Sequence, residues 1–263
     1  MRRLAPSIFL SLLGVAIAAP GHSANTPNLG ALRPHTGGQL YVQRVATLQA
    51  GQLYSRIAPG TFAAQWQAPW QQPTHEQWQS LLAHEATTMA ASQGQSPLAV
   101  VVGDSLCLWL PQEQLPRDRL WLNQSISGET TAHMVRRITF FASARPSVVY
   151  VMAGVNDLKT GVAPDVTVSN MELIVQRLRV QHPQARIVVL SILPTRLSNL
   201  PQPAVGQLNQ QIAIAVQRRG ATFVDLQPAF KDSQGLLRAE LTTDGLHLNE
   251  QGYGLLTAYL GRI

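Results

Sequence analysis

Short apolar runs that alternate with amphipathic segments fill the chain from Pro97 onward. Strands of a parallel sheet are buried on both faces and are therefore apolar throughout, and the crossovers between them are helices with one apolar stripe. This pattern predicts an α/β fold, a three-layer αβα sandwich with about five parallel strands. The expected strands cover residues 98–102, 120–123, 148–152, 187–192 and 222–225.

Apolar residues recur at helical spacing between these runs, so each crossover is expected to bury one stripe on the sheet. The stripes are Met134, Ile138 and Phe141; Met171, Ile174, Val175 and Leu178; and Val205, Leu208, Ile212 and Val216. A last helix is expected to begin at Asn249, a good N-cap residue, although Gly252 and Gly254 weaken it.

The segment before this domain differs in composition. Residues 20–96 are predicted to be a linker followed by a mostly helical accessory extension, and residues 97–263 a single α/β domain. Within the extension, the glutamine-rich residues 38–73 suggest one hairpin, and Thr74 is expected to cap a helix. Three aromatic residues, Phe62, Trp66 and Trp70, follow one another at helical spacing. We expect them to dock the extension onto the domain, with a carbohydrate platform as the alternative.

The first residues have the composition of an export signal. Arg2 and Arg3 precede an apolar stretch, which ends in small residues around Ala16 and Ala18 that suit a signal peptidase. We therefore predict a signal peptide over residues 1–19 and a mature protein that is periplasmic or extracellular. The apolar stretch is shorter than the roughly 20 residues that cross a bilayer, so no membrane span is expected.

The formal net charge is +6, which raises the question of nucleic-acid binding. The basic residues are scattered, however, and form no basic run or finger spacing, so no nucleic-acid partner is predicted. The chain has one cysteine, Cys107, which excludes an intramolecular disulfide. Because it lies in an apolar segment, we expect it to be buried and structural. The oligomeric state is left open, and a monomer is compatible with the sequence.

Ser105 directly follows the first expected strand, within Gly103-Asp104-Ser105-Leu106. Open parallel sheets place their sites at the carboxyl ends of strands, and a helix that begins there aims its free N–H groups at the serine oxygen. This position suits a nucleophile. The alternative is that the serine is only a helix cap.

A serine hydroxyl becomes a good nucleophile only when a base removes its proton and a third group holds that base. Six of the seven histidines fall in the linker, in the extension or on expected helix surfaces. His133 and His182 are the two expected on helix surfaces. His247 lies in a loop before the last helix, with Asp244 close before it and Gly245 between them to allow a turn. A loop cap and a surface histidine would give the same pattern.

Acyl transfer also needs donors aimed at the oxyanion of the tetrahedral intermediate. Two further strand ends offer such donors: Gly128 through its backbone N–H and Asn156 through its side-chain amide. Either residue alone has an ordinary reading as loop chemistry. Four polar motifs at the ends of successive predicted elements are a stronger signal than any one of them.

Together these motifs resemble the four blocks of the GDSL/SGNH hydrolase family, in the same order and spacing, from about residue 97 to the end. The matching residues are Gly103-Asp104-Ser105-Leu106, Gly128, Gly154-Val155-Asn156-Asp157 and Asp244-Gly245-Leu246-His247. The resemblance implies a flavodoxin-like fold with Ser105 as nucleophile, His247 as base and Asp244 orienting it. It also implies an oxyanion hole of the Ser105 N–H, the Gly128 N–H and the Asn156 side chain. Ser125 departs from the pattern, since many members carry glycine there.

The sequence thus predicts an exported serine esterase that acts on acyl or acetyl esters of carbohydrates or lipids. No metal or cofactor is expected, because the chain has no zinc motif, phosphate-binding glycine loop or cysteine pair. Two alternatives remain open: an O-acyltransferase with the same triad, and a non-catalytic surface protein that binds glycans through Trp66, Trp70 and Trp78.

Overall fold

A computed structural model describes residues 33–67, 71–200 and 202–263 of the chain. The expected signal peptide, residues 1–19, and Trp70 lie outside the described residues.

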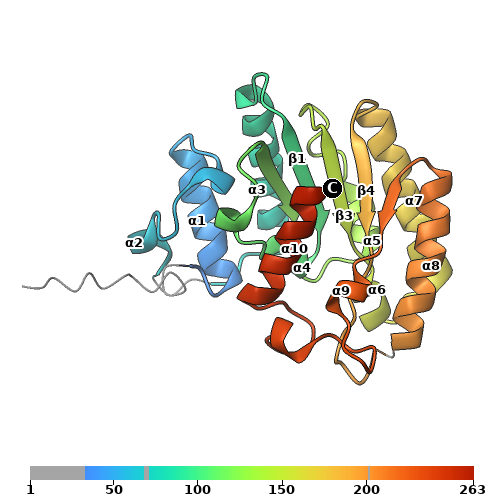
Figure 1. Cartoon of the computed structure of the whole chain (residues 1–263). Coiled ribbons are helices and arrows are strands. Elements are labelled where there is room, and N and C mark those ends of the chain that lie inside the picture. Colours follow the sequence, from blue (N-terminus) through green and yellow to red (C-terminus); the bar gives the residue numbers. More distant parts are fainter. Residues whose placement is uncertain (1–32, 68–70, 201) are drawn as a thin grey trace, which may run out of the picture.

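A parallel sheet forms the centre of the molecule (Figure 1). Its strands run in the order β2-β1-β3-β4-β5, and every neighbouring pair is parallel. This arrangement confirms the predicted α/β fold, and the expected strands agree with the observed ones to within two residues at each end. The strands are β1 (Leu98–Gly103), β2 (Leu120–Ser125), β3 (Val148–Met152), β4 (Arg186–Leu190) and β5 (Thr222–Val224).

Alternate residues of each strand enter separate cores on the two faces of the sheet. In β1, Leu98 and Val100 belong to one core and Ala99 and Val101 to the other. The first core also takes residues from α3 (His75–Ser92), α5 (Thr131–Arg137), α7 (Pro164–Gln181) and α8 (Gln202–Arg218). The second takes residues from α4 (Ser105–Leu108), α9 (Gln227–Phe230) and α10 (Glu250–Arg262). Each stripe is thus buried as the three-layer prediction requires.

The expected helix ends are confirmed at Thr74 and Asn249, which cap α3 and α10. Gly252, expected to weaken α10, is required by packing, because a Cβ atom there would lie 2.3 Å from the Leu241 carbonyl oxygen. The predicted helix through Phe141 is shorter than expected, since α5 ends at Arg137. No helix in the described part of the chain is both long and apolar enough to cross a membrane.

The hairpin predicted within residues 38–73 is wrong. This segment forms α1 (Gly37–Gln49), the short helix η2 (Tyr54–Arg56) and α2 (Ala63–Trp66). The physical reason lies in Thr36 and Gln39, which form a capping box that starts α1 by satisfying two free N–H groups. Trp66 and Trp78 are buried, so neither presents an exposed platform, and Trp78 packs with Leu108 and Ile126 of the α/β domain.

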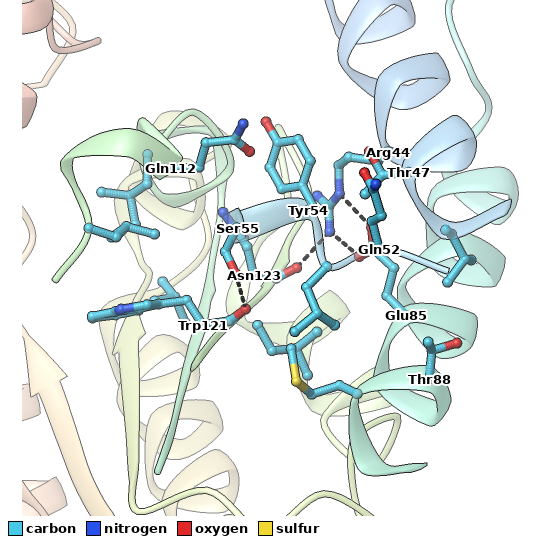
Figure 2. A pocket seen from close by; sticks show the side chains of 17 residues that line it. Arg44, Thr47, Gln52, Tyr54, Ser55, Glu85, Thr88, Gln112, Trp121 and Asn123 are labelled. Atoms are coloured by element: carbon cyan, nitrogen blue, oxygen red, sulfur yellow. Dashed lines mark hydrogen bonds and ion pairs between the residues drawn. The ribbon is translucent and has the colours of Figure 1, made fainter. Parts of the chain in front are cut away.

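The extension covers the outer edge of β2, which has no neighbouring strand among the residues that the structure describes. Side chains of the extension donate to successive outward-facing carbonyls: Arg56 Nη2 to Arg119 O at 2.6 Å, Ser55 Oγ to Trp121 O at 2.9 Å and Arg44 Nη2 to Asn123 O at 2.8 Å. Figure 2 shows the last two of these bonds. Unpaired edge carbonyls are otherwise a template for another chain, so the extension closes this edge.

Arg44 is held in place by a buried ion pair with Glu85 of α3 (Figure 2). Its guanidinium lies over the rings of Tyr54 and Trp78, at 5.3 and 5.6 Å from their centroids. Burial opposes the charge of Arg44, but the charge of Glu85 and its hydrogen bond act more strongly together and raise the pKa of Arg44. Arg44 therefore remains charged inside the protein.

Replacing Arg44 by methionine leaves Glu85 as a buried charge without its partner, so we expect Arg44→Met to lower the free energy of unfolding by about 3–5 kcal/mol. The measurement is urea unfolding followed by circular dichroism. Arg44→Met combined with Glu85→Leu is expected to recover most of the loss, because it removes both charges.

Arg219→Met is the matched control, since the side chain of Arg219 is 48 % exposed and its pair with Glu172 spans 3.5 Å. Its cost is expected to stay below about 1 kcal/mol. Equal losses for the Arg44 and Arg219 variants would contradict this account.

Candidate active site

Polar residues gather at the carboxyl ends of β1 and β3, where the strand order reverses. Within the sheet, β2 lies on one side of β1, whereas β3, β4 and β5 lie on the other side of β1. Such a switch point leaves a crevice above the strands, which is where open α/β sheets bind ligands. Ser105 begins α4 directly after β1, and Asn156 lies in α6 (Val155–Lys159) directly after β3.

Ser105, His247 and Asp244 form an unbroken series of hydrogen bonds. The distance from Ser105 Oγ to His247 Nε2 is 3.0 Å, and that from His247 Nδ1 to Asp244 Oδ2 is 2.7 Å. Gly245 has a φ of 87°, a conformation that favours glycine. The turn at Gly245 lets the Asp244 carboxylate reach the His247 ring within the same loop. The structure therefore brings together the three residues predicted from the sequence.

Asp244 stays ionised over a wide pH range. Partial burial raises its pKa, but hydrogen bonds from the His247 side chain and from two backbone N–H groups lower it to about 2. An ionised carboxylate only accepts hydrogen bonds, so His247 Nδ1 must carry a proton. Nε2 of a neutral imidazole is then an acceptor, as a base that faces a serine hydroxyl has to be.

The expected oxyanion donors occupy positions compatible with that role. Ser105 is the first residue of α4, and N–H groups in the first turn of a helix have no acceptor within the helix. Gly128 lies in the turn after β2 with a φ of 80°. The Asn156 side chain is buried, and its Nδ2 donates to the Glu129 carbonyl at 3.0 Å, which fixes the amide and leaves its second N–H free of this bond.

A buried ion pair that sequence reasoning missed supports this region. Glu129 directly follows Gly128, and its carboxylate pairs with Arg137 of α5. His75, the first residue of α3, binds the same carboxylate at 2.9 Å. Arg137 also donates to the Gln124 carbonyl at the end of β2, at 2.7 Å. The adjacency of Glu129 to Gly128 was visible in the sequence, but nothing there indicated its partners.

Asp104 is a buried carboxyl group next to the serine. Its Oδ1 accepts from the Leu106 N–H at 3.0 Å and so caps α4. Burial is the main cause that raises its pKa, to about 7, and this single backbone hydrogen bond offsets only part of the effect. The pKa values of Asp104 and Asp244 are thus shifted in opposite directions, although both residues adjoin the same site.

Two other expectations concern nucleophiles and bases outside this series. Cys107 is buried, as predicted, and burial raises the pKa of its thiol well above the usual value, so it stays protonated. His182 was expected on a helix surface, and this is wrong: it stacks on Phe141 with ring centroids 5.2 Å apart and is buried. Burial lowers its pKa and keeps it neutral.

The segment after Ser105 serves both packing and the site. Leu106 and Leu110 belong to the second core, on the face of the sheet that α4, α9 and α10 cover. Leu108, Trp109 and Leu110 also line a cavity that reaches His247. Within the described residues, no cluster of three or more histidine, cysteine or acidic side chains could hold a metal ion.

Comparison with known proteins gives consistent results. Residues 102–255 match the model of the GDSL-like Lipase/Acylhydrolase family. Platelet-activating factor acetylhydrolase IB subunit alpha1 from Homo sapiens is 32% identical over 177 residues, which cover 63% of this chain and 74% of that protein.

Two solved structures share the fold. One from Streptococcus pneumonia, whose description mentions a platelet activating factor, has a TM-score of 0.65 at 24% identity and covers 71% of this chain and 91% of its own. A GDSL-like lipase from Bacteroides thetaiotaomicron has a TM-score of 0.59 at 18% identity, with coverages of 68% and 95%.

Burial of Asp104 predicts a pH-dependent stability. Its pKa is about 7 in the folded chain against an ordinary 3.8, so between these values the unfolded chain has released a proton that the folded chain still binds. Stability therefore falls as the pH rises through this window. We expect Asp104→Asn, which is isosteric and uncharged, to be more stable than the native chain at about pH 8, with a difference that shrinks towards about pH 4.

Urea unfolding at several pH values measures this difference. Asp165→Asn serves as the control, because Asp165 is exposed at the start of α7, and its effect should vary little with pH. If the difference in free energy of unfolding between Asp104→Asn and the native chain did not change with pH, burial would not destabilise the charged form of Asp104, and this account would be wrong.

Proposed function

Because this chain belongs to the GDSL-like Lipase/Acylhydrolase family, we propose that it is an exported serine esterase that hydrolyses carboxylic esters through Ser105, His247 and Asp244. The observation that carries this proposal is the hydrogen-bond series from Ser105 Oγ through His247 to Asp244 at the carboxyl end of the sheet.

In this mechanism, His247 Nε2 takes the hydroxyl proton while Ser105 Oγ attacks the ester carbonyl carbon. The carbonyl oxygen becomes an oxyanion, stabilised by the N–H groups of Ser105 and Gly128 and by the Asn156 amide. As the intermediate collapses, His247 gives its proton to the oxygen of the leaving alcohol, and an acyl-enzyme remains. His247 then takes a proton from water as the water attacks the acyl-enzyme, and it returns this proton to Ser105 Oγ as the acid leaves.

We propose a short acyl group, and acetyl in particular, as the part that is transferred. The support is the likeness to platelet-activating factor acetylhydrolase subunits, whose name specifies an acetyl group. The signal peptide predicted for residues 1–19 supports substrates in the periplasm or outside the cell, among acylated carbohydrates and lipids. The glycan-binding alternative has less support, since Trp66 and Trp78 are buried.

Replacement of Ser105 tests the proposal directly. We expect the mature protein to release acetate from 4-nitrophenyl acetate without any added alcohol, and Ser105→Ala to lower kcat about a thousandfold or more. Asp244→Asn should lower it between about a hundredfold and ten-thousandfold, because the uncharged amide no longer holds the imidazole in the required tautomer.

Ser96→Ala is the matched control, since Ser96 is exposed in the turn before β1. Full activity of Ser105→Ala would refute the serine mechanism. Turnover that appears only with an added alcohol would instead identify an O-acyltransferase.

The role of Gly128 can be separated from its effect on folding. Alanine at this position meets open space but requires a φ of 80°, so the backbone of the oxyanion loop should shift. We expect Gly128→Ala to lower kcat about tenfold to a hundredfold with a smaller change in KM.

Gly235 offers the control, because it has the same φ of 80° and the same open surroundings but follows α9. Both alanine variants should lose about 1 kcal/mol of stability, and only Gly128→Ala should lose activity. Equal activities of the two variants would remove Gly128 from the oxyanion hole.

A further inference from the structure

A cavity of about 450 Å³ opens beside His247. Three parts of the chain line it: the loop after α4, the segment from Thr243 to α10, and the N-terminal extension. Its volume falls in the range of roughly 300–1,000 Å³ that is usual for small-molecule sites. An acetyl group, with three heavy atoms, would occupy only a small part of it. The cavity therefore has room for another part of the substrate.

The position of the cavity identifies that part. His247 must pass its proton to the oxygen of the leaving alcohol, so the alcohol lies on the side of the imidazole. The carbonyl oxygen lies on the opposite side, towards the oxyanion donors. The cavity is lined by His247 but not by Ser105, Gly128 or Asn156. It thus adjoins the place of the alcohol and not that of the carbonyl oxygen.

We propose that this cavity binds the alcohol half of the ester, that the alcohol is a carbohydrate, and that the N-terminal extension selects it. The proposal rests on the esterase function proposed above and adds the class of substrate and the segment that recognises it.

The composition of the wall favours a carbohydrate. Trp109 and Tyr54 are partly exposed residues of the cavity wall, and an aromatic ring in such a wall can pack against the C–H face of a sugar. Around them lie charged groups that can bond hydroxyls: Arg33 pairs with both Glu113 and Glu250, and all three line the cavity. An alkyl chain would cover these charged groups without forming hydrogen bonds to them, which is unfavourable.

The extension supplies part of this wall from outside the family domain. Arg33, His35 and Tyr54 line the cavity, yet the family match covers only residues 102–255. Arg33 connects the extension to the loop after α4 and to α10 through its two ion pairs. Selection of the alcohol would then be a property that this chain adds to the shared catalytic domain.

The test uses three acetyl esters that differ only in the alcohol: ethyl acetate, decyl acetate and a methyl glucoside with one O-acetyl group. We expect the sugar ester to have the highest kcat/KM, measured by acetate release. His35 is exposed at the cavity, so His35→Trp fills space there. It should lower the ratio of kcat/KM for the sugar ester to that for ethyl acetate by about tenfold or more.

His84→Trp is the matched control, an exposed histidine of the same extension that lies on α3 away from the cavity, and it should leave the ratio unchanged. A preference for decyl acetate, or an unchanged ratio in His35→Trp, would overturn the proposal.

Absence of acetate release from all three esters would instead count against the esterase function. Calorimetric titration of Ser105→Ala with the sugar ester then decides about the cavity. Binding that His35→Trp weakens supports a carbohydrate site, and absence of binding overturns it.

Discussion

The buried ion pair between Glu129 and Arg137 connects more of this structure than any other contact described. Arg137 holds the Gln124 carbonyl and reaches the Gly103 carbonyl at 3.5 Å, which links the ends of β1 and β2. The backbone carbonyl of Glu129 receives the Asn156 amide, and its carboxylate receives His75. Removing either charge would leave the other buried without its partner, which commonly costs several kcal/mol. This one electrostatic contact thus links the loop of Gly128, the Asn156 amide and the start of α3.

The two aspartates near Ser105 show how surroundings assign different properties to one side chain. Asp104 is buried with one backbone donor, and its pKa rises to about 7. Asp244 is half exposed and accepts from the His247 ring and two backbone N–H groups, and its pKa falls to about 2. Opposite shifts in neighbouring carboxyls often separate structural from catalytic roles. Here the residue with the low pKa is the one that orients the imidazole.

Much of the fold and of the site was predictable because both depend on local patterns. Apolar runs specify buried parallel strands, and parallel strands bring their carboxyl ends together, so Ser105 and Asn156 had to lie near each other. Long-range pairs left no such pattern. Arg44 and Glu85 are separated by 41 residues, and nothing near either indicated the other. The hairpin prediction failed for a local reason, since the capping box of Thr36 and Gln39 starts a helix in this segment.

The position of the extension at the edge of β2 has a consequence for how the chain matures. Synthesis proceeds from the N-terminus, so the residues of α1 and η2 are made before the strand whose carbonyls they bind. This segment is therefore available to cover β2 when the sheet assembles, and an open edge could otherwise pair with a neighbouring chain. The extension thus gives the β2 edge an intramolecular protection against aggregation that remains part of the folded protein.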